Sequence, residues 1–113
     1  KDAGVDVALA TDYNPGSCNI QSMPFIISLA CIYFNMGVLD AFKASTYISA
    51  RSLMLDEKIG SIEKGKKADI IIWNIKDVNE IPYRIYSHPI QKVLKNGKPV
   101  ITAWLLEDQV CKI

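Results

Sequence analysis

An isolated strand signal near the start of the sequence limits what this chain can fold into. Residues Val5 to Ala10 are apolar or β-branched, interrupted only by Asp6, a pattern typical of a short buried strand. Such a strand needs neighbours to pair its backbone groups, but the next strand signals come only after residue 60. We therefore expect its partner strands to lie in polypeptide outside these 113 residues, with this chain as the C-terminal piece of something longer.

A long helix is predicted after this strand. Ser22 is suited to cap a helix that ends near Asn35, and Pro24 is tolerated in its first turn. Gly37 is suited to the left-handed residue that closes a helix. The apolar run Met23 to Phe34 is too short to cross a bilayer, which needs about 20 residues. We expect this helix to be buried on nearly all sides instead.

Shorter helices are predicted next. Residues 39–44 should form one, and Ser45 or Thr46 can cap another that runs to about Leu53. The small side chain of Ala41 would let these helices pack closely. The chain is therefore expected to be helical from the first cap to about residue 53.

The pattern changes to strands in the second half. A glycine turn followed by the β-branched run Ala68 to Trp73 predicts a strand. The dipeptide Asn96-Gly97 predicts a hairpin with a type I′ turn, because both central residues of that turn need positive φ. The hairpin strands are expected at residues 91–95 and 99–103, after a longer connection over residues 77–88.

Charge and cysteine content exclude several classes of protein. A net charge of +1 offers no broad field for nucleic acid or an acidic membrane surface. The three cysteines are far apart and form no CxxC pair, so neither a zinc knuckle nor a disulfide framework is indicated. Reduced thiols in a cytoplasmic protein are the simplest interpretation. The lysines of the segment Glu63 to Lys67 are expected to be solvated at a hairpin tip.

The stretch LATDYNPGS, Leu9 to Ser17, gathers hydrogen-bonding groups directly after the first strand. It places a carboxylate, Asp12, at the strand end and follows it with Asn14, Gly16 and Ser17. From the residues alone, two interpretations stay open. The loop is an ordinary turn whose Asp bonds its own backbone, or a strand end that presents a reactive carboxylate to a ligand.

Three segments resemble the amidohydrolase superfamily. The segment IGSIEKGKKADIIIWN, Ile59 to Asn74, is similar to the signature G-x-I-x-x-G-K-x-A-D and strand that enters a β-sandwich appended to a (β/α)8 barrel. The segment VLKNGKPV, Val93 to Val100, resembles a later hairpin of that sandwich. The D-[FY]-N-P-G-S loop, with the helix after it, resembles one branch of the superfamily that opens an imidazolone ring. Residues 104–113 carry no resemblance.

The resemblance implies an α/β fold class. Residues 1–56 would be the C-terminal end of a metal-dependent-hydrolase barrel, with its last strand, active-site loop and helices. Residues 57–113 would be strands of the β-sandwich. The remainder of the barrel would come from the same parent chain, and homodimers are common in the family. No nucleic acid or membrane partner is implied.

The resemblance also assigns roles. Asp12 matches the strand-end Asp that is a metal ligand and helps take the proton from the attacking water. Asn14, Gly16 and Ser17 match residues that contact the substrate or its ring-opened product. The reaction implied is the hydrolytic opening of 4-imidazolone-5-propanoate to N-formimidoyl-L-glutamate in histidine degradation, assisted by zinc or iron. A Pro-Gly-Ser turn, through its N–H groups and the Ser17 hydroxyl, suits the propanoate of this substrate.

The sequence lacks the rest of the metal site. A catalytic zinc normally has three protein ligands, and the H-x-H pair of the family is missing. The single histidine, His88, is not expected to join Asp12 on a metal, so the chain alone should be inactive. Two alternatives remain: another amidohydrolase, such as a deaminase or a different cyclic amidase, or a non-catalytic sandwich module used for assembly.

Overall fold

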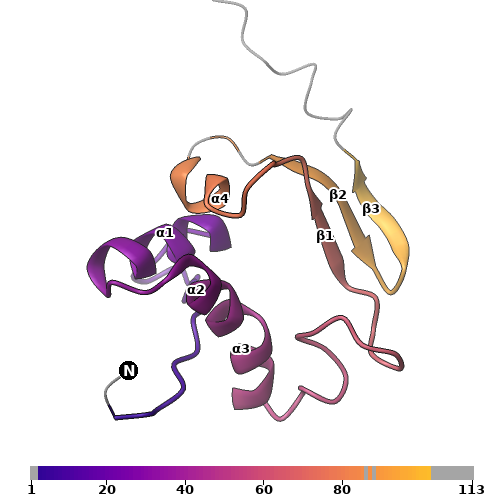
Figure 1. Ribbon diagram of the computed structural model, residues 1–113, viewed down its shortest axis with the longest axis horizontal. Helices are drawn as coiled ribbons and strands as arrows, with labels where there is room; N and C mark the ends of the chain where they lie inside the picture. The colour runs from indigo at the N-terminus through magenta and orange to yellow at the C-terminus, as the bar shows by residue number, and fades with distance from the viewer. Residues whose placement is uncertain (1–2, 86, 88, 103–113) are drawn as a thin grey trace, which may run out of the picture.

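The computed structural model describes residues 3–85, 87 and 89–102, so His88, Trp104 and Cys111 lie outside the described residues. Helices gather at one end and an antiparallel sheet at the other (Figure 1). The elements are α1 (Met23–Tyr33), α2 (Val38–Ser45), α3 (Tyr47–Ser52), β1 (Ile70–Trp73), α4 (Glu80–Tyr83), β2 (Ile90–Lys95) and β3 (Lys98–Thr102). The mixture of helices and strands agrees with the predicted α/β class.

Residues 5–10, predicted as a strand with its partners outside these 113 residues, are not paired into a strand in the described part of the chain. This segment is extended but pairs with no described strand. It is held at Leu9, whose N–H donates to the Ala44 carbonyl at 3.1 Å and whose carbonyl accepts from the Ser49 hydroxyl at 2.9 Å. Val5 remains 67% exposed. A strand is defined by its neighbours, and the described residues offer none here.

The start of α1 follows the prediction and its end does not. The Ser22 hydroxyl accepts from the Phe25 N–H at 3.3 Å, which confirms the cap. The left-handed residue after the helix is Asn35, with φ of 50°, and not Gly37. Gly37 is extended and forms the N-cap of α2. Asn tolerates left-handed backbone, so either residue satisfied the local rule.

Burial of α1 is one-sided, which corrects the expectation of a helix buried all round. Ile27 and Ala30 are buried and form a small core with Ala41 of α2. Ile32 and Tyr33 are 69% and 76% exposed. The reason is that only α2 and α4 pack on this helix among the described elements. No helix in the described ranges is long and apolar enough to span a bilayer.

The second and third helices lie within a residue or so of their predicted positions. Thr46 is the N-cap of α3, but its hydroxyl donates to the Phe42 carbonyl at 2.7 Å and does not cap the helix. Gly60 then passes close to α3 with φ of +94°. A Cβ on Gly60 would stand 2.6 Å from the Ala50 Cβ, so only glycine fits at this crossing.

The lysine-rich segment is not a hairpin tip, and of its lysines Lys64 and Lys67 are exposed as predicted whereas Lys66 is not. It forms turns in the connection between α3 and β1, and the Lys66 side chain is only 11% exposed. The Lys66 ammonium donates to the Ser61 hydroxyl at 2.6 Å and to the Glu63 carboxylate at 3.0 Å. It also lies 6.0 Å from the centre of the Tyr47 ring. Two local partners and the ring of the distant Tyr47 therefore surround this cation.

The sheet confirms the hairpin prediction. Strand β2 pairs antiparallel with β1 and with β3, in the order β1-β2-β3. The turn residues Asn96 and Gly97 have φ of 49° and 77°, as a type I′ turn requires. The Asp69 carboxylate accepts from the Asn96 N–H at 2.8 Å, and the Gly97 N–H donates to the Ala68 carbonyl. The hairpin is thus tied to the residues that precede β1.

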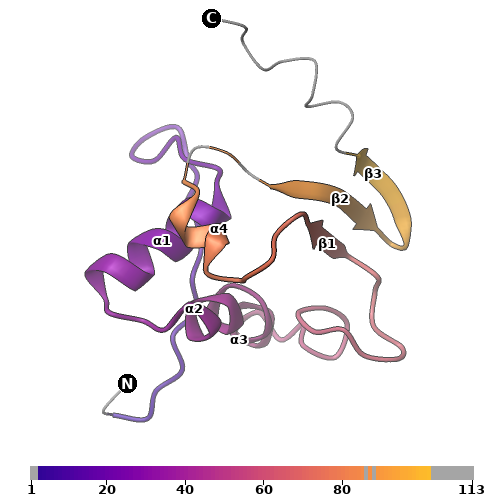
Figure 2. The same cartoon turned by 45° about the horizontal axis from the view of Figure 1, so that its top comes forward.

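A short helix that the sequence pattern did not predict joins the helices to the sheet. Figures 1 and 2 both place α4 against α1, on the path between β1 and β2. Ile81 of α4 is 2% exposed, and the buried Ser28 hydroxyl of α1 donates to the Pro82 carbonyl at 2.5 Å. This hydrogen bond joins residues 54 positions apart in the sequence, so only the tertiary structure reveals it.

Candidate active-site loop

The loop between the extended segment and α1 is compact. In Figure 2 it projects past α1 at the edge of the molecule. The Asn14 N–H donates to the Cys18 carbonyl at 2.8 Å, and an isolated bridge joins these two residues. The half-buried Cys18 thiol donates to the Thr11 carbonyl at 3.2 Å. Cys18 therefore closes the base of the loop as a partly packed residue.

Asn14 organises the interior of this loop through its side-chain amide. Its Oδ1 accepts from the Gly16 N–H at 2.9 Å and from the Ser17 N–H at 2.8 Å. Its Nδ2 donates to the Asp12 carbonyl at 2.6 Å and lies 3.0 Å from the Ser17 hydroxyl oxygen. The structure thus brings Asp12, Asn14, Gly16 and Ser17 into one hydrogen-bonded unit.

Asp12 has an unusual backbone and an available carboxylate. Its φ is 51°, in the left-handed region that few non-glycine residues adopt. The residue is exposed, and no hydrogen bond or ion pair joins its carboxylate to the residues that the structure describes. An ordinary Asp turn, in which the carboxylate bonds the following backbone, is therefore not what forms here. That role belongs to Asn14.

A pocket of about 290 Å³ lies in the loop and is lined by residues 13–19. Asn14, Gly16 and Ser17 are among the lining residues, whereas Asp12 is not. The N–H groups of Gly16 and Ser17 are bonded to the Asn14 amide oxygen, and the Ser17 hydroxyl also contacts the Asn14 amide, donating to its Oδ1 at 3.2 Å. A hydroxyl can rotate, so Ser17 is the turn residue that can exchange this bond for one to a ligand. Tyr13 and Asn19 also line this pocket, and the sequence analysis assigned neither a role, although Tyr13 occupies the [FY] position of the loop motif.

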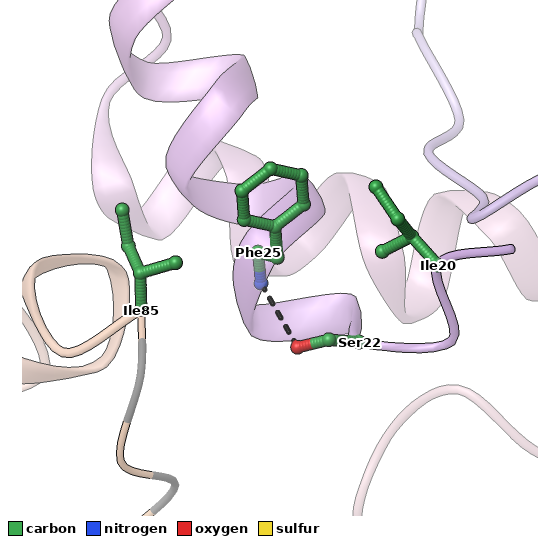
Figure 3. Close-up of a pocket in the computed structure, with 4 residues that line it drawn as sticks. All are labelled: Ile20, Ser22, Phe25 and Ile85. Carbon is green, nitrogen blue, oxygen red and sulfur yellow. Dashed lines mark hydrogen bonds between the residues drawn. The ribbon is translucent and has the colours of Figure 1, made fainter. Parts of the chain in front are cut away.

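A second pocket, of about 230 Å³, lies between the start of α1 and the residues after α4. Figure 3 shows the Phe25 ring between the side chains of Ile20 and Ile85, with the Ser22 cap beside it. Its lining holds no titratable side chain. It contains none of the predicted site residues, and its apolar walls offer no group for acid–base chemistry.

The ionisable groups with shifted pKa lie away from the loop and serve structure. The Ser61 hydroxyl and the Lys66 ammonium lower the pKa of Glu63. The Lys95 ammonium and the Asn96 N–H lower the pKa of Asp69. Both carboxylates fix turns, so their pKa shifts do not mark a second reactive centre.

A metal centre needs more ligands than this part of the chain brings together. Over residues 3–85, 87 and 89–102, no group of three or more His, Cys, Asp or Glu side chains is placed to hold an ion. Zinc sites in enzymes normally use three protein ligands. The available Asp12 carboxylate fits as one ligand of such a set, and the described residues alone do not make the site.

Comparison with known proteins identifies the class. The model of the Amidohydrolase family matches residues 1–100, and the chain belongs to this family. Among its relatives is the imidazolonepropionase of Alkaliphilus metalliredigens strain QYMF, 44% identical over 100 residues, which are 88% of this chain and 24% of that protein. The imidazolonepropionase of Geobacillus kaustophilus strain HTA426 is 42% identical over 100 residues, 88% of this chain and 24% of the relative.

A solved structure agrees with this assignment. The crystal structure of an amidohydrolase from Thermotoga maritima MSB8 superposes on 89% of this chain with a TM-score of 0.69 and 28% sequence identity. The match covers 24% of that chain. This chain therefore spans about a quarter of the length of the proteins that it resembles.

Proposed function

We propose that this chain is the C-terminal portion of a metal-dependent hydrolase that opens the ring of 4-imidazolone-5-propanoate to N-formimidoyl-L-glutamate, a step of histidine degradation. The observation that carries the proposal is the folded loop, in which the Asp12 carboxylate has no partner among the described residues and lies beside the hydrogen-bonded Asn14, Gly16 and Ser17. Membership of the amidohydrolase family and the similarity to imidazolonepropionases support it.

The proposal divides the chain at the connection between the helices and the sheet. Residues 1–56 would complete a (β/α)8 barrel, with residues 5–10 as its last strand, and residues 57–113 would belong to the appended β-sandwich. The extended but unpaired segment at residues 5–10 supports this division, because its open edges suit neighbouring parallel strands. The remaining strands would come from the rest of the parent chain. The parent is proposed to be cytoplasmic, and a homodimer is one assembly that it would form.

Asp12 would act at the reacting bond. A zinc or iron ion, held by Asp12 and by ligands from the rest of the protein, would supply the Lewis acidity that makes water a nucleophile at neutral pH. The Asp12 carboxylate would accept a proton from that water as the hydroxyl adds to the ring carbonyl carbon. When the carbon–nitrogen bond breaks, Asp12 would return the proton to the leaving nitrogen.

Asn14, Gly16 and Ser17 would form the substrate end of the site. Ser17 is exposed and its hydroxyl rotates, so it can donate to the substrate propanoate. At Gly16, a Cβ would stand 3.3 Å from the Asn14 Oδ1, so glycine leaves this side of the loop open for a ligand. Asn14 keeps both residues in place through its amide oxygen.

The proposal is tested with the full-length protein that contains this chain. The purified protein is loaded with zinc or with ferrous iron and mixed with 4-imidazolone-5-propanoate. We expect the ring absorbance to disappear and mass spectrometry to detect N-formimidoyl-L-glutamate. A protein that leaves this substrate intact but hydrolyses another cyclic amide, or releases ammonia from an amino-substituted ring, would be a different amidohydrolase. Inactivity on all of these substrates would favour a non-catalytic module.

A further inference from the structure

The segment that leads to Asp12 is fixed to the helices at Leu9. The Leu9 N–H donates to the Ala44 carbonyl at 3.1 Å, and the Leu9 carbonyl accepts from the Ser49 hydroxyl at 2.9 Å. The Leu9 side chain packs against the small core of α1 and α2. Figures 1 and 2 both show this segment passing beside α2 before it enters the loop. Both backbone groups of Leu9 are therefore bonded to the α2–α3 corner, residues 44–49.

Leu9 is close enough to Asp12 for its attachment to set where Asp12 lies. Of the two residues between them, Thr11 has its contacts inside the loop, since its carbonyl accepts from the Cys18 thiol. Three residues of extended chain span at most about 11 Å, so a shift at Leu9 is passed to the Asp12 backbone. In enzymes, a displacement of about 1 Å at a reacting group can lower the rate about 100-fold.

Ser49 holds Leu9 through a single hydroxyl. Its Oγ lies 2.9 Å from the Leu9 oxygen and 2.7 Å from the Ala44 oxygen, and the Ala44 oxygen also accepts from the Leu9 N–H. The hydroxyl has one hydrogen, which these two carbonyls share. A serine in a helix ordinarily bonds a carbonyl three or four residues earlier in the same helix. Ser49 instead reaches a segment 40 positions away in the sequence.

A second side-chain contact to this segment is weaker. Arg51, also on α3, forms an ion pair with Asp6. The two side chains are 49% and 46% exposed, so solvent screens their attraction. Asp6 also lies twice as far from Asp12 along the chain as Leu9 does. The half-buried hydroxyl bond at Leu9 is therefore the stronger and nearer restraint on the position of Asp12.

The α2–α3 corner is itself held in place. Ala44 and Ala50, which flank Ser49 in this packing, are both buried. On the other side of α3, Gly60 passes so close that a Cβ there would stand 2.6 Å from the Ala50 Cβ. A tightly packed support of this kind keeps the Ser49 hydroxyl in one position, as the orientation of a metal ligand requires.

We propose that Ser49 is a positioning residue for Asp12, because its hydroxyl bond to the Leu9 carbonyl sets where the segment before the loop ends. The inference rests on the proposed function and adds a residue that lies outside the loop motif. Ser49 is not among the residues that line the loop pocket. It acts on the metal site through Leu9 and Asp12, as outer hydrogen-bond partners do in metal enzymes.

The test compares Ser49→Ala with Ser45→Ala in the full-length protein. Both serines are half-buried, but the Ser45 hydroxyl donates to the Phe42 carbonyl at 2.9 Å, inside α2. Ser49→Thr keeps a hydroxyl at the same position and is the conservative variant. Zinc affinity is measured by competition with a chelator, and kcat and KM are measured with the imidazolone. Thermal unfolding checks each fold.

We expect Ser49→Ala to lower zinc affinity and kcat about 10-fold each, while KM changes less, because Ser49 does not line the loop pocket. Ser49→Thr should recover both values to within about threefold, and Ser45→Ala should stay within about twofold of the unmodified protein. If Ser49→Ala does not fold, Ser49→Cys decides, because a thiol fills the same place but is a weak donor.

Two results would overturn the proposal. The first is a lower unfolding temperature in Ser49→Ala with zinc affinity and kcat unchanged, which is the result of a purely structural role. The second is a change confined to KM, which would mean that Ser49 affects substrate binding and not the metal ligand.

The zinc measurement separates this inference from the proposed function. If the unmodified protein binds zinc but does not open the imidazolone ring, the proposed function fails, and the zinc affinities of the Ser49 and Ser45 variants still decide the role of Ser49. If the unmodified protein binds no zinc at all, Asp12 is not a metal ligand and the positioning role is overturned as well.

Discussion

Asp12 combines two properties expected of a catalytic carboxylate, namely an orientation set by its backbone and no competing partner among the described side chains. We predict that Asp12→Asn in the full-length protein lowers kcat about 10²- to 10⁴-fold, because an amide cannot accept the proton of the attacking water. Asp56→Asn, which changes the same chemical group outside the loop, should keep its kcat. Near wild-type turnover of Asp12→Asn would remove the proposed role.

Ser17 is the residue of the loop whose hydroxyl can turn toward a ligand. We predict that Ser17→Ala raises KM about 10-fold or more, the usual effect of losing a hydrogen bond to a charged group, and lowers kcat by a smaller factor. Steady-state kinetics over a range of substrate concentrations measure both constants. Ser52→Ala, a change in the exposed end of α3, serves as the control. Equal kinetics for the two variants would exclude a Ser17 contact with substrate.

At the scale of the elements, the segment that connects α3 to β1 passes close to α3 at Gly60. Gly60→Ala combines a positive φ with a Cβ 2.6 Å from that of Ala50, and we predict a loss of about 3 kcal/mol in the free energy of unfolding. Gly65→Ala is a matched control, because Gly65 also has positive φ but no heavy atom within 4 Å of its Cβ position. It should lose only about 1 kcal/mol. Urea unfolding measures both, and equal losses would contradict the close approach.

The β2–β3 hairpin is tied to the residue before β1 through Asp69. The Lys95 ammonium and the Asn96 N–H lower the pKa of this carboxyl in the folded state. Its stabilisation is therefore present above the unfolded pKa of about 3.9 and is lost as pH falls through the lower folded pKa. We predict that the difference in unfolding free energy between the wild type and Asp69→Asn narrows below about pH 4. A difference that stays constant down to pH 2 would exclude this linkage.

Elements that depend on neighbouring residues could be predicted from the sequence, whereas those that depend on distant partners could not. The Asn96-Gly97 turn and the Ser22 cap are local, and both are confirmed. The packing of α4 on α1 and the approach of Lys66 to the Tyr47 ring depend on residues far apart in sequence. The strand expected at residues 5–10 depends on neighbours that the described residues lack.

The same division applies to the candidate site. The D-Y-N-P-G-S pattern predicted the loop and its candidate residues, because side-chain chemistry and spacing are visible in a sequence. The pattern did not show that the Asn14 amide bonds the Asp12 carbonyl, since this bond depends on the left-handed backbone of Asp12. A short polar residue after an acid predicts a turn, but which side chain bonds which backbone group follows only from φ and ψ.

At the scale of the whole molecule, large apolar side chains remain exposed on the helices, on the sheet and on the segments that connect them. They include Val5, Ile32, Tyr33, Leu39, Met54, Ile71 and Val100. A folded soluble domain rarely exposes so many apolar groups unless another surface covers them. In the proposed parent enzyme, the rest of the barrel and sandwich would provide that surface.

This exposure leads to a prediction about the isolated 113-residue chain of 12.6 kDa. On its own it should associate, because open strand edges and apolar faces meet in solution when their intramolecular partners are absent. Size-exclusion chromatography with light scattering should give masses well above 12.6 kDa, and dialysed samples should retain no zinc. The full-length protein should instead form a defined species that retains zinc. A stable 12.6 kDa monomer would show that these faces need no covering, and the proposed division of the barrel at residue 56 would then have to be abandoned.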